Sequence, residues 1–275
     1  MAATWRLLKS APPTAWFGMA VIAIYIFVAI AAPAIAPFGE TEVVGGEYEP
    51  WSWVYLLGTD SLGRDMFSRL VFGARNTIGI AALATALAFL LGATVGFLSA
   101  TLGGWADQLL SRFVDILMAI PSLIFALLIL TIVGTSIPAL VAVIAILDST
   151  RIFRVARAVA MNIVVMDYVM TARLRGEGMW WLITREIVPN ATAPLLAELG
   201  LRFCFVFLFI SALSFLGLGI QPPTADWGSM VRENATLISF GDVTPLFAAA
   251  AIALLTVGVN FVVDWMLHVT SGLKE

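Results

Sequence analysis

Four ionisable side chains fall within or beside long apolar runs, where a charge is costly and often functional. They are Asp148, Glu198, Arg202 and Asp264. Groups of this kind can couple the movement of a solute to protons or ions. All four lie close to the ends of the predicted spans, which favours a simpler role as boundary residues paired with water or a neighbouring helix. Asn260 lies deeper in its apolar run and is a candidate for a transport pathway or for pairing between helices.

The sequence carries no pattern for catalysis or nucleotide hydrolysis. A phosphate-binding loop needs a lysine after a glycine-rich turn, and the two lysines, Lys9 and Lys274, do not follow one. One histidine, His268, and one cysteine, Cys204, exclude the usual clustered metal sites. We therefore expect a non-catalytic chain with no cofactor or metal of its own, driven by a partner or by an ion gradient.

A polar segment rich in arginine is the most distinctive part of the chain. We expect a short helix over residues 167–175, ended at Gly176 because glycine can adopt a positive φ. The pair Glu177 and Gly178 keeps the turn open, and a second helix from Met179 to Glu186 is closed by Pro189. Residues 151–185 hold six of the 15 basic residues: Arg151, Arg154, Arg157, Arg173, Arg175 and Arg185.

The second of these helices presents apolar side chains beside charged ones, with Trp180, Trp181 and Ile183 predicted to be exposed. This pattern is typical of a helix that docks into a groove on another protein. The alternative is an amphipathic helix that lies on the membrane surface.

Composition places the elements around this segment in a membrane. The 275 residues are 61% hydrophobic and 12% charged, against about 25% charged in soluble domains. Six runs are long enough to cross a hydrocarbon core of about 30 Å. We expect Pro121 to kink the third span, and the Gly92–Gly96 pair to allow close helix packing in the second. The predicted spans are Trp16–Ala36, Thr77–Ala100, Phe113–Val133, Ser136–Phe153, Pro194–Ile220 and Pro245–Leu267.

The basic residues set the expected orientation. With the N-terminus inside and the first apolar run retained as a span rather than cleaved as a signal peptide, eleven basic residues are inside and four outside, which agrees with the positive-inside rule. The outer loop 37–76 begins with an acidic stretch. The inside group is Arg6, Lys9, Arg112, Arg151, Arg154, Arg157, Arg173, Arg175, Arg185, Arg202 and Lys274, and the outside group is Arg64, Arg69, Arg75 and Arg232.

Three ordered stretches resemble one known family. LGTDSLGRDMFSRLVFGAR (Leu57–Arg75), TARLRG (Thr171–Gly176) continuing to Pro189 and Asn190, and LSFLGLGIQPPTADWGSM (Leu213–Met230) are similar to blocks in permease subunits of bacterial ATP-binding-cassette importers. The resemblance is to the dipeptide, oligopeptide and nickel class, and within it to the second, "C" type dipeptide permease. It runs from about residue 16 to the end.

The resemblance implies an all-α membrane protein with six transmembrane helices and the type I importer fold. Residues 1–15 would be a cytoplasmic segment, and residues 16–275 the transmembrane domain. Loop 157–190 would be the coupling loop seated in a cleft of an ATPase subunit. The family loop opens Glu-Ala-Ala, whereas this chain has Met170, Thr171 and Ala172. The implied coupling residues are Tyr168, Thr171, Ala172, Gly176, Glu177, Gly178, Trp180, Ile187 and Pro189.

Two outer blocks have two interpretations each. Residues 58–65 are expected to form a turn and a short helix capped by Thr59 or Asp60, and Trp227 is an expected interfacial anchor. Either the polar groups satisfy one another against the bundle, or they contact an external substrate-binding protein. The residues concerned are Thr59, Asp60, Gly63, Arg64, Asp65, Asp226 and Trp227.

Taken together, the sequence predicts a multi-pass inner-membrane permease with both termini cytoplasmic. Its expected partners are a second homologous permease, two ATPase subunits that bind ATP and Mg²⁺, a periplasmic or extracellular substrate-binding protein and the lipid bilayer, but no nucleic acid. Peptides or related small solutes are the expected cargo. A nickel-chelate or opine permease of the same class, an ion-coupled secondary carrier and a membrane scaffold are the alternatives.

Overall fold

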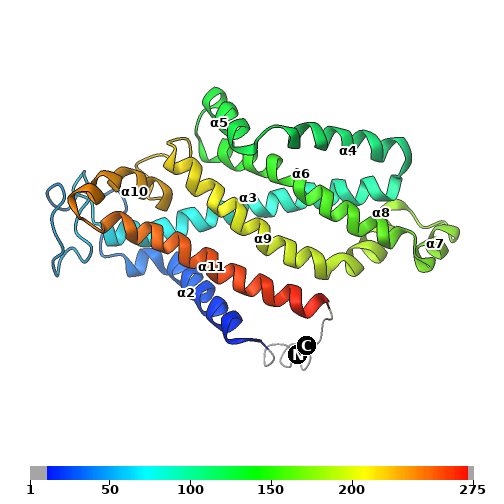
Figure 1. Cartoon of the computed structure of the whole chain (residues 1–275), viewed down its shortest axis with the longest axis horizontal. Coiled ribbons are helices and arrows are strands. Elements are labelled where there is room, and N and C mark those ends of the chain that lie inside the picture. The colour runs from blue at the N-terminus through cyan, green and yellow to red at the C-terminus, as the bar shows by residue number, and fades with distance from the viewer. Residues whose placement is uncertain (1–10, 272–275) are drawn as a thin grey trace.

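The computed structural model describes residues 11–271, and these residues form helices and connecting turns without a named strand. The long helices run side by side along the long axis of the molecule (Figure 1). The helices of the first half are α2 (Pro13–Ile35), α3 (Met66–Leu102), α4 (Gly104–Ala119), α5 (Ser122–Val133) and α6 (Ile137–Val164). Those of the second half are α7 (Asp167–Leu174), α8 (Met179–Trp181), η1 (Leu182–Ile187), α9 (Val188–Phe215), α10 (Trp227–Asn234), η2 (Ala235–Phe240) and α11 (Thr244–Ser271).

Four helices within residues 11–271 are long and apolar enough to cross a membrane. They are α2, α3, the continuous helix Met179–Phe215 and α11, and the bent pair α4–α5 makes a fifth if it is one span. The helix α6 is 28 residues long, but it carries Asp148, Arg151, Arg154 and Arg157 along its length, which lowers its hydropathy. The expected all-helical membrane fold is therefore confirmed at the level of four to five candidate spans.

The predicted third span is broken rather than kinked, which corrects the expectation for residues 113–133. The helices α4 and α5 meet at 85°. Pro121 occupies the position before the first residue of α5, with φ −56° and ψ 120°, and Ile120 before it is extended, with φ −86° and ψ 129°. A proline disfavours the helical conformation in the residue that precedes it, so the chain leaves one helix at Ile120 and starts another at Ser122.

The helices α3 and α6 pack through glycines of α3. A Cβ atom added to Gly92 would lie 2.5 Å from the Ser149 carbonyl oxygen, and one added to Gly96 would lie 2.8 Å from the Phe153 carbonyl oxygen. Real Cβ atoms essentially never approach another atom to less than 3.0 Å. The Gly92–Gly96 pair therefore permits the close helix approach that the sequence predicted.

Two groups of residues lie at opposite ends of the bundle. Helix α7 and the α3–α4 turn lie at one end, called here the α7 end, and loop 36–65 with α10 lies at the other, called the α10 end (Figure 1). Both predicted loops include helical residues. Helix α3 already begins at Met66, within the predicted outer loop 37–76, and α6 continues to Val164, into the predicted loop 157–190.

Candidate functional site

Helix α7 ends as the sequence predicts. It spans Asp167–Leu174, and Gly176 follows with φ +83°. The amide of Gly176 donates to the Arg173 carbonyl at 2.9 Å, and the amide of Glu177 donates to the Ala172 carbonyl at 3.2 Å. These two bonds make the Schellman motif, which satisfies the last carbonyls of a helix and needs a left-handed residue at the position of Gly176.

One face of this turn is packed and the other is open. Val169 and Ala172 are fully buried in a cluster with Leu182, Ile183 and Ile187. The prediction that Ile183 is exposed is therefore wrong, and Ala172 and Ile187 face inward rather than toward a partner. Four large apolar side chains remain exposed on the turn: Leu174 at 89%, Trp180 at 58%, Met170 at 56% and Tyr168 at 42%.

The second helix of this segment does not end at Pro189, as the sequence predicted. Residues 179–215 form one continuous helix through α8, η1 and α9, with Pro189 in the first turn of α9. The turn Leu182–Ile187 is a π-helix, and a proline has no amide hydrogen to leave unpaired. Helix α7 thus leads, through the turn at residues 175–178, into one of the longest helices of the bundle.

Ion pairs and a carbonyl contact hold the α7 end together. The guanidinium of Arg157 in α6 forms two hydrogen bonds with the carboxylate of Asp107 in α4, which also accepts one from the Ser99 hydroxyl. Arg173 of α7 donates to the Thr101 carbonyl at 3.2 Å. Arg173 thus ties α7 to α3, and the Arg157–Asp107 pair ties α6 to α4.

The residues predicted at the outer mouth form a buried network at the α10 end. Asp60 accepts hydrogen bonds from the Leu62 and Arg64 amides, and its Oδ2 atom lies 2.7 Å from Arg64 Nε and 3.3 Å from Arg69 Nε. Both arginines also reach Glu233 of α10, at 3.5 and 3.3 Å. Thr59, Asp60, Arg64 and Asp65 are at most 4% exposed. Asp60 and Arg64 pair with each other, whereas the Thr59 hydroxyl and the Asp65 carboxylate bond backbone groups of the loop and of α3.

The cap in this region differs from the prediction. Asp65, rather than Thr59 or Asp60, caps a helix, because its carboxylate accepts from the Ser68 amide at 2.7 Å at the start of α3. No helix forms over residues 58–65. A Cβ atom added to Gly63 would lie only 2.2 Å from the backbone carbonyl oxygen of Gly45. Gly63, with φ +71°, therefore lets the loop close.

Trp227 is a core residue rather than an interfacial anchor, which corrects the prediction. It is 2% exposed, its Nε1 donates to the Leu70 carbonyl at 2.9 Å, and its ring packs edge-on against Tyr25 and Phe207. Asp226 beside it caps α10 and accepts from the Thr77 hydroxyl at 2.9 Å. Burial raises the pKa of Asp226, although its hydrogen-bond donors act in the opposite direction.

Asn260 donates to the Thr256 carbonyl of its own helix at 2.9 Å. This contact neither brings it to a cavity nor pairs it with another helix.

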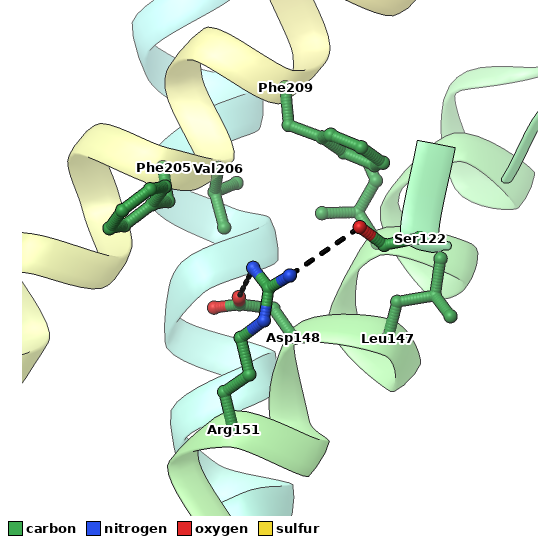
Figure 2. A pocket seen from close by; sticks show the side chains of 8 residues that line it. Ser122, Leu147, Asp148, Arg151, Phe205, Val206 and Phe209 are labelled. Atoms are coloured by element: carbon green, nitrogen blue, oxygen red, sulfur yellow. Dashed lines mark hydrogen bonds and ion pairs between the residues drawn. The ribbon is translucent and has the colours of Figure 1, made fainter. Parts of the chain in front are cut away.

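Asp148 and Arg202 lie near the middle of α6 and α9, away from the helix ends where the sequence placed them. Asp148 Oδ1 lies 3.5 Å from Arg202 Nη1 and 3.8 Å from Arg151 Nη1. Arg202 Nε lies 2.7 Å from Glu198 Oε1. The two groups form an ion pair, but the N–H bond is not directed at the oxygen atom as a hydrogen bond requires. Asp148, Arg151, Arg202 and Glu198 are called here the α6–α9 charge cluster. Two of them, Asp148 and Arg151, line a small cavity next to Ser122, the first residue of α5 (Figure 2).

Sequence reasoning missed two features of these sites. Leu174 is the most exposed large apolar residue of the α7 turn. Its position between Arg173 and Arg175 is the sequence pattern that could have indicated this exposure. Glu233 completes the network of Arg64 and Arg69, and no local pattern connects residues so distant in the sequence.

Comparison with protein-family models places residues 92–271 in one match, described as "Binding-protein-dependent transport system inner membrane component". The match covers more than half of the 275-residue chain. It includes the α7 turn, α10 and the α6–α9 charge cluster.

Curated proteins match over most of the chain. A dipeptide transport system permease protein of Alkalihalophilus pseudofirmus is 33% identical over 90% of this chain and 82% of its own length. A di/tripeptide transport system permease protein of Pseudomonas aeruginosa is 35% identical over 90% of this chain and 86% of its own length. A glutathione transport system permease protein of Pectobacterium atrosepticum is 30% identical over 78% and 71%.

Proposed function

Because the chain belongs to the family of binding-protein-dependent inner membrane components, as a permease of ATP-binding-cassette importers of the dipeptide and oligopeptide class, we propose that it carries peptides inward as one of two paired permeases. The second permease is a homologue, and the two together line the pathway. Two ATPase subunits bind ATP and Mg²⁺, so this chain is non-catalytic. A substrate-binding protein delivers the solute from outside.

The proposed topology has six spans in the inner membrane, with both termini cytoplasmic. The α4–α5 pair counts as one broken span, and α6 is the sixth, its charged residues facing the bundle or a partner subunit rather than lipid. The α7 end is cytoplasmic, since it holds Arg112, Arg157, Arg173, Arg175 and Arg185, whereas loop 36–65 at the α10 end is acidic.

The observation that carries this proposal is the α7 turn. It exposes Leu174 and Trp180 and buries its opposite face against residues of Met179–Phe215. An exposed apolar turn on a rigid base suits a cleft in a partner protein. We assign it as the coupling element, with Leu174, Trp180, Met170 and Tyr168 in contact with an ATPase subunit and Gly176, Glu177, Gly178 and Pro189 shaping the turn.

Coupling then follows from the continuity of the helices. When ATP draws the two ATPase subunits together, α7 moves with the cleft that holds it. The displacement passes as a rigid-body movement along Met179–Phe215 and, through Arg173 and Arg157, to α3, α4 and α6. The pathway alternates between two states of access, with the helices moving as packed units.

The buried residues at the α10 end have a structural role and do not contact a partner protein. Thr59, Asp60, Arg64, Asp65 and Asp226 hold the loop and α10 in shape. The surface offered to the substrate-binding protein consists of the exposed side chains above them, with Trp53 at 87% and Trp51 at 61% exposed.

Reconstitution tests the proposed function. The chain is co-expressed with the second permease, the ATPase subunits and the substrate-binding protein of its source organism, and placed in liposomes. We expect uptake of a radiolabelled dipeptide that requires both ATP and the binding protein. Uptake by this chain alone, driven by an ion gradient and indifferent to ATP, would instead establish a secondary carrier.

A further inference from the structure

Asp148 is a buried carboxylate with very little hydrogen bonding. The residue is 7% exposed, and its Oδ2 atom has no hydrogen-bond partner among the described residues. Its Oδ1 atom meets Arg202 and Arg151 only at ion-pair distances of 3.5 and 3.8 Å. An ionised carboxylate can accept about four hydrogen bonds, and buried polar groups are normally satisfied. The Oδ2 atom can therefore accept from a further donor.

The cavity beside Asp148 joins three helices. Its volume is about 60 Å³, well below the roughly 300 Å³ of a typical small ligand pocket, so it takes one end group rather than a whole peptide. Asp148 and Arg151 come from α6, Phe205 and Phe209 from α9, and Ser122 from the first turn of α5 (Figure 2).

One group of this wall, the Asp148 carboxylate, can accept hydrogen bonds from a cation even though Arg151 lines the same cavity. The carboxylate of Asp148 provides unused acceptors, and rotation of a carboxylate about its χ2 bond is soft, so Oδ2 can turn toward the cavity without moving the helix. The ring of Phe209 offers an aromatic face that can attract a cation, whereas the face of Phe205 already carries the Arg202 guanidinium, 4.8 Å from the ring centroid. Arg151 spans from Asp148 to the Ser122 hydroxyl, which lies 3.5 Å from its Nη2 atom, and therefore borders the cavity on one side.

We propose that this cavity binds the terminal ammonium group of the transported peptide, with Asp148 as its acceptor. This inference rests on the proposed function, because it assigns the substrate's amino terminus to a site in this permease. The primary ammonium supplies up to three N–H donors, from which the Oδ2 atom of Asp148 can accept. Arg202, which is itself paired with Glu198, holds the carboxylate in place from α9, so the site joins the two helices α6 and α9 through the substrate.

The test compares two peptides that differ only in this group. The assembled complex is placed in nanodiscs without the substrate-binding protein, and binding of L-alanyl-L-alanine and of its N-acetyl derivative is measured by calorimetry. We expect the wild type to prefer the free amino terminus by at least about tenfold in Kd, the equivalent of about 1.4 kcal/mol. In Asp148→Asn the ratio of the two Kd values should fall to nearly one, because only the peptide with the free amino terminus binds more weakly.

Matched variants separate binding from structure. Asp115→Asn removes an exposed carboxylate of α4 that pairs with Arg154, and it should retain the wild-type preference. If Asp148→Asn does not assemble, Asp148→Asn with Arg151→Gln keeps the net charge and leaves the Arg202–Glu198 pair intact, and it should also lose the preference.

Several outcomes would overturn the proposal. The proposal fails if the wild type binds neither peptide up to tens of millimolar, or if it binds both peptides equally. It also fails if the Asp148→Asn variant keeps the preference for the free amino terminus, or if it binds both peptides more weakly by the same factor. If one of these results is found in a complex that still imports dipeptides with ATP, only the ammonium site is refuted and the proposed function stands. Absence of ATP-driven import by the wild type refutes the function on which the site rests.

Discussion

Gly176→Pro is expected to abolish stimulation of ATP hydrolysis by substrate and to reduce recovery of the ATPase subunits with the complex by at least tenfold. Gly176 has φ +83°, whereas proline is held near −65°. The two bonds of the Schellman motif at Gly176 and Glu177 cannot form together in the variant, so the turn that carries Leu174 and Trp180 changes shape. Hydrolysis in liposomes and co-purification on a tag in this chain measure the effect.

A second glycine gives a matched control for this variant. Gly241 has φ +80°, and like Gly176 it has no described atom within 4 Å of an added Cβ. It follows η2 near the α10 end. The variant Gly241→Pro should suffer similar backbone strain, yet recover the ATPase subunits at the wild-type level. Equal losses in both variants would mean that strain, and not the α7 turn, governs assembly.

Gly92→Leu is expected to cause the largest loss of stability among the glycine substitutions of α3. Its Cβ atom would lie 2.5 Å from the Ser149 carbonyl and 2.8 Å from Ile152 Cβ, and backbone atoms of a packed helix cannot move aside locally. The helices α3 and α6 must separate. Overpacking typically costs about 1–3 kcal/mol and occasionally more, and we expect about 3 kcal/mol or more in the free energy of unfolding, measured by denaturation in detergent.

Gly79→Leu makes the same change in the same helix as the control. No described atom lies within 4 Å of a Cβ atom at Gly79, and a leucine there extends an apolar surface. Its free energy of unfolding should stay within about 0.5 kcal/mol of the wild type, as for surface substitutions generally. A Gly92→Leu variant as stable as Gly79→Leu would show that α3 and α6 are not held at close range.

Local features of the fold could be predicted from the sequence because they depend on neighbouring residues. The end of α7 at Gly176 follows from the conformational freedom of glycine, and the close packing at Gly92 and Gly96 follows from their missing side chains. The break at Pro121 was located correctly, but its extent was not. Proline fixes its own φ and restricts one neighbour, whereas the 85° angle also depends on how α5 packs against α6 and α9.

Features that depend on helix phase or on distant partners could not be predicted. Ile183 was predicted to be exposed because it is an apolar residue in a short helix with flanking charges, and that pattern does not reveal the π-helical turn Leu182–Ile187, in which Ile183 is buried. The predicted end of the fourth span at Phe153 placed Asp148 near a boundary, whereas α6 continues to Val164. The buried state of Arg69 depends on Glu233, which the sequence alone does not connect with it.

The central claim is that the α7 turn docks onto an ATPase subunit, and photocrosslinking from position 174 tests it most directly. A benzophenone amino acid replaces Leu174, which is 89% exposed, and in a separate control it replaces Leu62, which is 57% exposed near the α10 end. We predict that position 174 crosslinks to an ATPase subunit in the membrane-embedded complex, and that position 62 does not. Crosslinks from position 174 to lipid alone, or equal ATPase crosslinks from both positions, would contradict the account.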